Sequence, residues 1–117
     1  MLGPPILRRG RGPQKSPTLA GGNYRLPALQ FLMPELSRFL GIVIAMYYRD
    51  HGPAHFHAIY GEFEITVEIE SGRINGTFPK RALTHVHEWR ELHRVELLEA
   101  WSLARTGQPL PGIDPLE

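Results

Sequence analysis

The clearest alternation of hydrophobic and polar positions lies in the segment FEITVEIE, residues 63–70. Its apolar residues share one face of an extended chain, and Glu and Thr fill the other. This pattern is typical of a strand with one buried face and one wet face. Shorter β-rich runs around it predict further strands at about 41–49, 55–60 and 73–77.

Two short turns join these strands into antiparallel hairpins. Gly61-Glu62 suits a two-residue loop, with Gly at the first central position. The predicted partners across this loop are Tyr60 with Phe63, Ala58 with Ile65, and Phe56 with Val67. A second turn at Ser71-Gly72 sets Glu70 opposite Arg73 and Ile69 opposite Ile74. Both registers place the apolar residues on one side of the sheet.

The pattern changes to a helical period after Pro79. Two helices are predicted at about 79–92 and 94–106, with Pro79 in the first turn and Gly107 just past the end. One apolar stripe holds Leu83, Val86, Leu97, Trp101 and Ala104. Leu92 and Val95 fall off this stripe, which predicts a break near His93. The expected fold class is α+β: an antiparallel meander of three or four strands with two C-terminal helices packed on one face.

The two ends of the chain lack the periodic patterns of this middle part. Residues 1–32 hold five Pro and five Gly and show no periodicity, so a disordered leader or a non-native extension before Met33 is expected. Residues 33–112 are predicted to form a single domain, and residues 113–117 a tail. The two tryptophans, Trp89 and Trp101, read as core or interface anchors.

Charge and cysteine content exclude several classes of function. The leader carries five basic residues and no acid, so residues 33–117 keep 13 − 5 = 8 basic groups against 12 acidic ones, a net charge of −4. Nucleic-acid contact is therefore expected only through the basic leader. With no cysteine, the chain forms no disulfide, thiol nucleophile or cysteine–zinc cage. No apolar run approaches a membrane span, and a cytoplasmic protein is expected.

The candidate chemistry lies in RDHGPAHFHAIYGEFE, residues 49–64, which places His51, His55 and His57 within seven positions. If Phe56 and Ala58 point into the core, His55 and His57 emerge on the opposite, polar face. The predicted register sets His55 opposite Glu68, and Glu68 opposite Asn75.

Three interpretations of this cluster stay open. His51, His55 and His57, or two of them with a Glu, suit a divalent metal such as zinc, iron or manganese. The same histidines with Glu68 suit acid–base catalysis without a metal. The third interpretation is a polar sheet face that meets solvent or a partner. The helical histidines His85, His87 and His93 are expected to be structural.

Three segments carry a family resemblance: residues 33–62, PKRAL at 79–83, and ELHRVELLEAWSLARTGQPL at 91–110. Together they resemble the bacterial domain-of-unknown-function family numbered 4160, over about residues 33–112. Family members show His, two prolines, then His-x-His; here Ala54 stands where the second proline is usual. The resemblance implies labels such as transcriptional regulator or toxin–antitoxin component, and a small neighbouring partner of the family numbered 2442. It implies no established activity.

Two functional hypotheses follow. The first is a non-enzymatic interaction or regulatory module of a two-gene, toxin–antitoxin-like unit, bound to that small partner or to a second copy of itself. The alternative is a small histidine-dependent hydrolase or ribonuclease-type toxin acting through His51, His55 and His57, with or without a metal. Whether the protein is an enzyme stays open at this level.

Overall fold

The computed structural model describes residues 33–116 of the chain. Residues from Met33 onward form one compact unit. The expectations for the basic leader, residues 1–32, lie outside the described residues. Within residues 33–116, no helix is long and apolar enough to cross a membrane.

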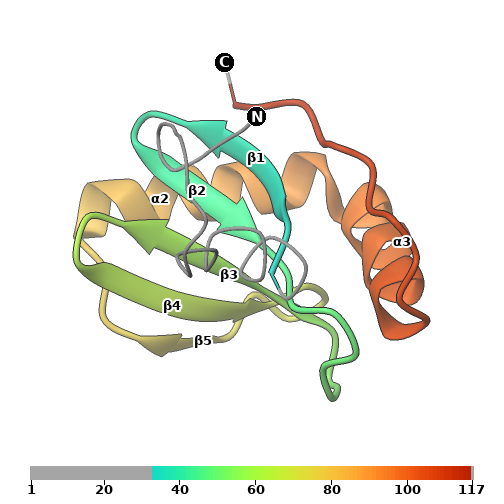
Figure 1. The fold of residues 1–117 in the computed structure, drawn as a ribbon. Helices are drawn as coiled ribbons and strands as arrows, with labels where there is room; N and C mark the ends of the chain where they lie inside the picture. Colours follow the sequence, from blue (N-terminus) through green and yellow to red (C-terminus); the bar gives the residue numbers. More distant parts are fainter. Residues whose placement is uncertain (1–32, 117) are drawn as a thin grey trace, which may run out of the picture. The chain divides into compact units, whose positions relative to one another are not determined.

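The fold is α+β, as predicted, with two helices following an antiparallel sheet (Figure 1). The sheet has five strands in sequence order, each paired with the next along the chain. The strands are β1 (Glu35–Phe39), β2 (Ile42–Ala45), β3 (His55–Tyr60), β4 (Phe63–Glu68) and β5 (Ile74–Gly76).

Strand β1 is the one that the sequence analysis missed. The pairing of β1 with β2 shifts register between Glu35 and Ser37, so the neighbours Leu36 and Ser37 are both buried. Such a bulge breaks the alternation on which strand prediction depends. Strand β2 consequently lies inside the sheet, between β1 and β3, and its backbone offers no free edge to a partner.

The β3–β4 hairpin has the predicted register. Tyr60 pairs with Phe63, and Phe56 pairs with Val67. Gly61 adopts φ +59° in the turn, a conformation that glycine adopts readily. The buried face and the polar face of both strands are therefore the predicted ones.

The predicted register of the β4–β5 hairpin is wrong by two residues. Ile74 pairs with Val67 instead of Ile69, and Asn75 pairs with Thr66 instead of Glu68. The cause is Arg90, whose guanidinium donates to the carbonyls of Ile69 and Glu70 at 2.8 and 3.2 Å. Those carbonyls bond to a helix and not to β5. Since strands alternate with a period of two, this shift leaves the buried face unchanged.

The helical segment breaks at His93, as predicted. Helix α2 (Lys80–Leu92) and helix α3 (Arg94–Arg105) meet there, and Leu92 and Val95 beside the break are 66% and 70% exposed. Helix α2 runs behind the sheet, and α3 stands at one end of it (Figure 1). His93 sits at the start of α3 but makes no side-chain cap hydrogen bond.

The core lies between the sheet and the helices. Trp89 is fully buried at its centre, with ring centroids 5.6 Å from Phe39 and 5.8 Å from Phe56. Trp101 is also buried, so both tryptophans are core residues as predicted. The predicted stripe holds too, because Val86, Leu97 and Ala104 are buried and Leu83 is partly buried.

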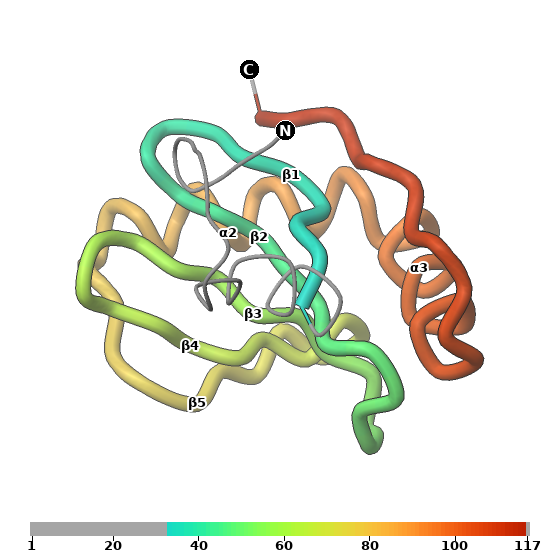
Figure 2. Tube along the Cα trace, viewed as in Figure 1, coloured from blue at the N-terminus to red at the C-terminus, as the bar shows by residue number. Residues whose placement is uncertain are grey.

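The segment after α3 returns along the molecule and ends beside β1 (Figure 2). The N–H of Ile113 donates to the carbonyl of Leu36 at 2.8 Å, and the indole of Trp89 donates to the carbonyl of Asp114 at 2.8 Å. Ile113 is buried. Residues that the sequence analysis assigned to a tail are thus attached to the domain, and they cover part of the outer edge of β1.

Candidate metal centre

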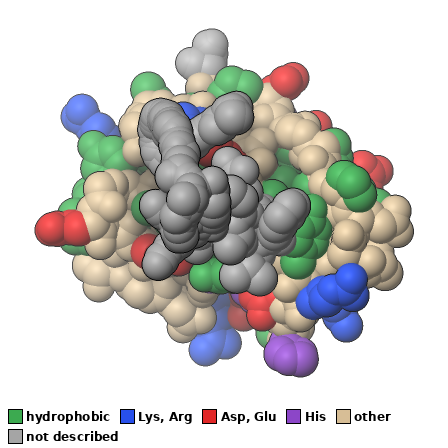
Figure 3. Space-filling view, in the orientation of Figure 1, with side chains coloured by type: hydrophobic (Ala, Val, Ile, Leu, Met, Phe, Trp, Pro, Cys, Tyr) green, Lys and Arg blue, Asp and Glu red, His purple; other side chains and the backbone are tan. Residues whose placement is uncertain are grey.

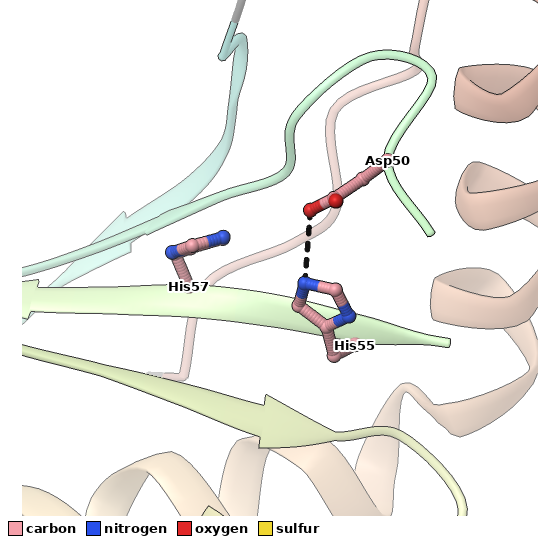
Figure 4. A group of neighbouring side chains, drawn as sticks. All are labelled: Asp50, His55 and His57. Carbon is pink, nitrogen blue, oxygen red and sulfur yellow. Dashed lines mark hydrogen bonds and ion pairs between the residues drawn. The ribbon is translucent and has the colours of Figure 1, made fainter. Parts of the chain in front are cut away.

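His55 and His57 leave β3 on the face opposite the core, as predicted. Their neighbours Phe56 and Ala58 are fully buried on the core face, and both imidazoles rise from the other side of the strand (Figure 4). His55 pairs with Glu68, and His57 pairs with Thr66.

This second face is more sheltered than the sequence analysis predicted. His57 is only 9% exposed. The ring of Tyr47 meets it edge-on at 4.8 Å, and Trp101 of α3 lies 5.2 Å from the ring of His55. Two aromatic side chains from outside β3 therefore shield the imidazoles from water, which strengthens any electrostatic interaction between them.

The loop between β2 and β3 brings a third group, Asp50, to the two histidines. The N–H of Arg49 donates to the carbonyl of Ala104 at 2.9 Å, which ties the loop to the C-terminal end of α3. Oδ1 of Asp50 accepts the N–H of His51 at 2.8 Å. Oδ2 of Asp50 then lies 3.0 Å from Nε2 of His55 (Figure 4).

Asp50, His55 and His57 form a group in which one donor atom from each residue lies within 4.8 Å of the others. Liganding atoms around one divalent ion stand about 3–4 Å apart when each is roughly 2.0–2.2 Å from the ion. Small side-chain movements would therefore bring this group onto a metal. Two imidazoles and one carboxylate are a donor set that suits zinc, iron and manganese.

The sequence analysis missed Asp50, and the structure places two of the predicted residues elsewhere. His51 is exposed and contacts the site only through its backbone N–H. Oε1 of Glu68 accepts the hydroxyl of Ser71 at 2.7 Å. The available signal for Asp50 was a carboxylate in a Gly/Pro loop, five positions before His55.

The hydrogen bonds at the far side of each ring indicate which nitrogen is free. Nδ1 of His55 lies 2.9 Å from the carbonyl of Pro53, and Nδ1 of His57 lies 3.1 Å from Oε2 of Glu64. Both partners are acceptors, so each Nδ1 carries a proton and donates it. In a neutral ring the lone pair then belongs to Nε2, the nitrogen that faces Asp50.

His57 is the more informative of the two rings. Its Nε2 is buried and has no hydrogen-bond partner among residues 33–116. A buried polar atom without a partner is costly. Since Nδ1 is engaged by Glu64, Nε2 is the ring nitrogen left to bind a cation.

His55 has oxygen acceptors at both ring nitrogens. Such a ring is stable in two forms. It is either an imidazolium that donates to both Pro53 and Asp50, or a neutral ring that shares a cation with the Asp50 carboxylate.

Another carboxylate on this face is already engaged. Glu35 pairs with Ala45, which pairs with His57, so Glu35 lies on the same face two strands away. Its carboxylate accepts two hydrogen bonds from Arg38, at 2.8 and 3.0 Å. This hydrogen bonding raises the pKa of Arg38 above its ordinary value, more than partial burial lowers it.

The remaining histidines lie on or between the helices. His93 contacts Glu96, and His85 lies 3.8 Å from Glu88. None of these helical histidines joins a metal-binding group among residues 33–116. In the part of Figure 3 that is not covered by grey atoms, the visible Lys and Arg side chains lie at separate places around the rim of the view.

Comparison with known proteins identifies a family. The model of a family described as "Domain of unknown function (DUF4160)" matches residues 41–102, which include the three clustered residues. The chain matches none of the curated proteins and none of the solved structures with which it was compared.

Proposed function

The chain belongs to the DUF4160 family, whose description names no activity, and on that premise we propose that its function depends on a divalent transition metal held by Asp50, His55 and His57. The observation that carries this proposal is the orientation of the two rings. Each Nδ1 lies within hydrogen-bond distance of an oxygen. Nε2 of His55 lies 3.0 Å from the carboxylate of Asp50, and one donor atom of His57 lies within 4.8 Å of both residues. Metal-binding histidines are held in this way by a carbonyl or a carboxylate on the outer nitrogen.

Metal content is the direct test. Untagged full-length protein is expected to bind one equivalent of Zn²⁺ or Fe²⁺ in a calorimetric titration. His57→Ala and Asp50→Asn are each expected to lower the affinity at least 100-fold, because each removes a ligand. His87→Ala, which changes a helical histidine outside the group, is the matched control and keeps wild-type affinity. Wild-type stoichiometry and affinity in a His55→Ala/His57→Ala protein would refute the site.

Acid–base catalysis at the same residues is a second candidate, supported by the 3.0 Å contact between Asp50 and His55. A carboxylate beside an imidazole orients the ring for proton transfer. This candidate describes a small histidine-dependent hydrolase or ribonuclease-type toxin. It predicts growth arrest or RNA decay on expression, and loss of that effect in His55→Ala while the circular dichroism spectrum stays unchanged. If the His55→Ala variant is as toxic as the wild-type protein, acid–base catalysis at this site is excluded.

A role in a cytoplasmic two-gene unit is the other candidate, either as a toxin–antitoxin component or as a transcriptional regulator. The supporting observation is the exposure of two apolar side chains, Leu92 and Val95, beside the break between α2 and α3. Exposed apolar side chains at a helix junction suit a protein partner, either the small protein encoded nearby or a second copy.

Co-expression with the neighbouring gene product tests this role. The two proteins are expected to co-purify, and a Leu92→Glu/Val95→Glu variant is expected to lose the partner. Arg105→Glu, an exposed change at the far end of α3, serves as the control. A wild-type protein that stays alone and monomeric counts against an interaction module.

A further inference from the structure

The protein offers three side-chain donors to the proposed metal, and residues 33–116 bring no fourth His, Asp or Glu to the group. The carboxylate of Glu64 contacts Nδ1 of His57, the nitrogen that is already hydrogen-bonded, and not Nε2. Glu68 is bound by Ser71, and Glu35 is bound by Arg38. Transition metals in proteins take four to six ligands, so at least one coordination position is left for a group from outside.

The three donors come from a single stretch of chain, with His55 and His57 on one face of β3 and Asp50 on the loop that leads into it. Figure 4 shows both rings attached to β3 and the Asp50 carboxylate reaching toward them from the loop. The group therefore lies between β3 and this loop, and an ion there would be held by both.

Solvent reaches this group unevenly. The side chains of His57, His55 and Asp50 are 11%, 17% and 29% exposed, so access increases toward Asp50. The next loop residues, His51 to Pro53, are exposed. A water molecule or a small ion can thus approach the metal past Asp50, while Tyr47 and Trp101 cover the imidazoles.

The donor types separate this site from a structural one. Structural zinc sites are closed by four protein ligands, mostly cysteines, whereas sites with three His or carboxylate ligands keep an open position for water. This chain has no cysteine. The net charge of a divalent ion with one carboxylate and two neutral imidazoles is +1, so one anionic ligand would neutralise it.

From these observations, and resting on the proposed metal site, we infer that the bound metal carries an exchangeable water on the Asp50 side and that small anions replace this water. A metal-bound water is far more acidic than bulk water. The centre therefore belongs with Lewis-acid sites that activate water, and not with sites that only hold a fold together.

Cobalt provides the test, because the visible spectrum of Co²⁺ depends on the number and type of its ligands. Full-length protein is loaded with one equivalent of Co²⁺ and titrated with azide. The expected result is a saturable change in the visible bands with one azide bound per metal. A spectrum that stays constant in a large excess of azide, while Co²⁺ remains bound, overturns the open position and leaves the metal site intact. Failure to bind Co²⁺ or Zn²⁺ at all overturns both.

The exposed His51 allows a more specific test, since it follows Asp50 directly in the loop and its imidazole is a further metal-binding group. His51→Ala is expected to show the wild-type cobalt spectrum and the same response to azide. If the wild-type protein ignores azide and His51→Ala responds to it, His51 fills the fourth position and the inference fails. Glu62→Gln, a change in the β3–β4 turn, controls for the loss of one exposed charged group.

Discussion

At the scale of single residues, the carboxylate of Glu64 has a defined task. It lies 3.1 Å from Nδ1 of His57, on the side of the ring away from Asp50. By accepting a hydrogen bond from the Nδ1–H group, the carboxylate leaves the lone pair on Nε2 and holds the ring in one orientation. Such outer partners contribute to metal affinity although they never touch the ion.

Glu64→Leu removes this acceptor and is expected to lower Zn²⁺ affinity about 10-fold to 100-fold. Glu64 is half-exposed, so the change should leave folding intact. A competition titration against a zinc-binding dye measures the effect, with Glu62→Leu as the control in the adjacent turn. Equal affinities in the two variants would mean that Glu64 does not orient His57.

The residue scale also shows what sequence reasoning could find at the site. The side of the sheet on which His55 and His57 emerge follows from strand alternation, and the structure agrees. Asp50 was not predicted because its position depends on a loop tied to α3 through Arg49 and Ala104, residues 55 positions apart. No local pattern encodes that contact.

At the scale of elements, Arg90 joins α2 to the β4–β5 connection. Its guanidinium is buried and donates to the carbonyls of Ile69 and Glu70, and Gly72 packs against it with φ +79°. A side chain at Gly72 would meet the guanidinium at about 3.0 Å. The helix therefore determines the shape of a hairpin that the turn sequence alone would have made shorter.

Arg90→Ala leaves the Ile69 carbonyl without its charged donor, while the Glu70 carbonyl keeps its hydrogen bond from Arg94 at 3.2 Å. The change is expected to lower the free energy of unfolding by about 1–3 kcal/mol. Urea unfolding in a chelator-containing buffer measures this change without a contribution from bound metal. Arg81→Ala, an exposed position on the same helix, should change stability by less than about 0.5 kcal/mol. If the two variants have the same free energy of unfolding, the hydrogen bonds of Arg90 do not stabilise the fold.

These hydrogen bonds of Arg90 also explain why the register of one hairpin was predicted correctly and the register of the other was not. The β3–β4 register depends on a two-residue turn and on local alternation, both of which are visible in the sequence. The β4–β5 register depends on Arg90, about 20 positions away, and the β1 strand is hidden by a bulge. Features determined by residues close in the sequence could be predicted. Features determined by residues distant in the sequence could not.

At the scale of the whole molecule, the proposed metal connects parts that are otherwise held separately. Asp50 belongs to a loop attached to α3, and the histidines belong to the middle strand of the sheet. A ligand that binds only the folded form stabilises it, and at 100 times its dissociation constant the gain is about 2.7 kcal/mol.

Zn²⁺ at that excess is therefore expected to raise the melting temperature by about 10–20 °C, since each kcal/mol shifts the melting temperature of a small domain by roughly 4–8 °C. Differential scanning calorimetry of the wild-type chain and of His57→Ala checks this. The variant should show a shift near zero. An equal shift in both proteins would assign the stabilisation to ions bound elsewhere.

The placement of both imidazoles on one pleated strand has a consequence for ion selection. Alternate residues on one face of a strand lie about 6.6–6.8 Å apart along the backbone, whereas the ring centroids of His55 and His57 are 5.5 Å apart. The two rings therefore lean toward each other, and together they offer two nitrogen donors to one ion. Calcium takes about six to eight oxygen ligands, so discrimination against calcium is inherent in the donor atoms of the strand.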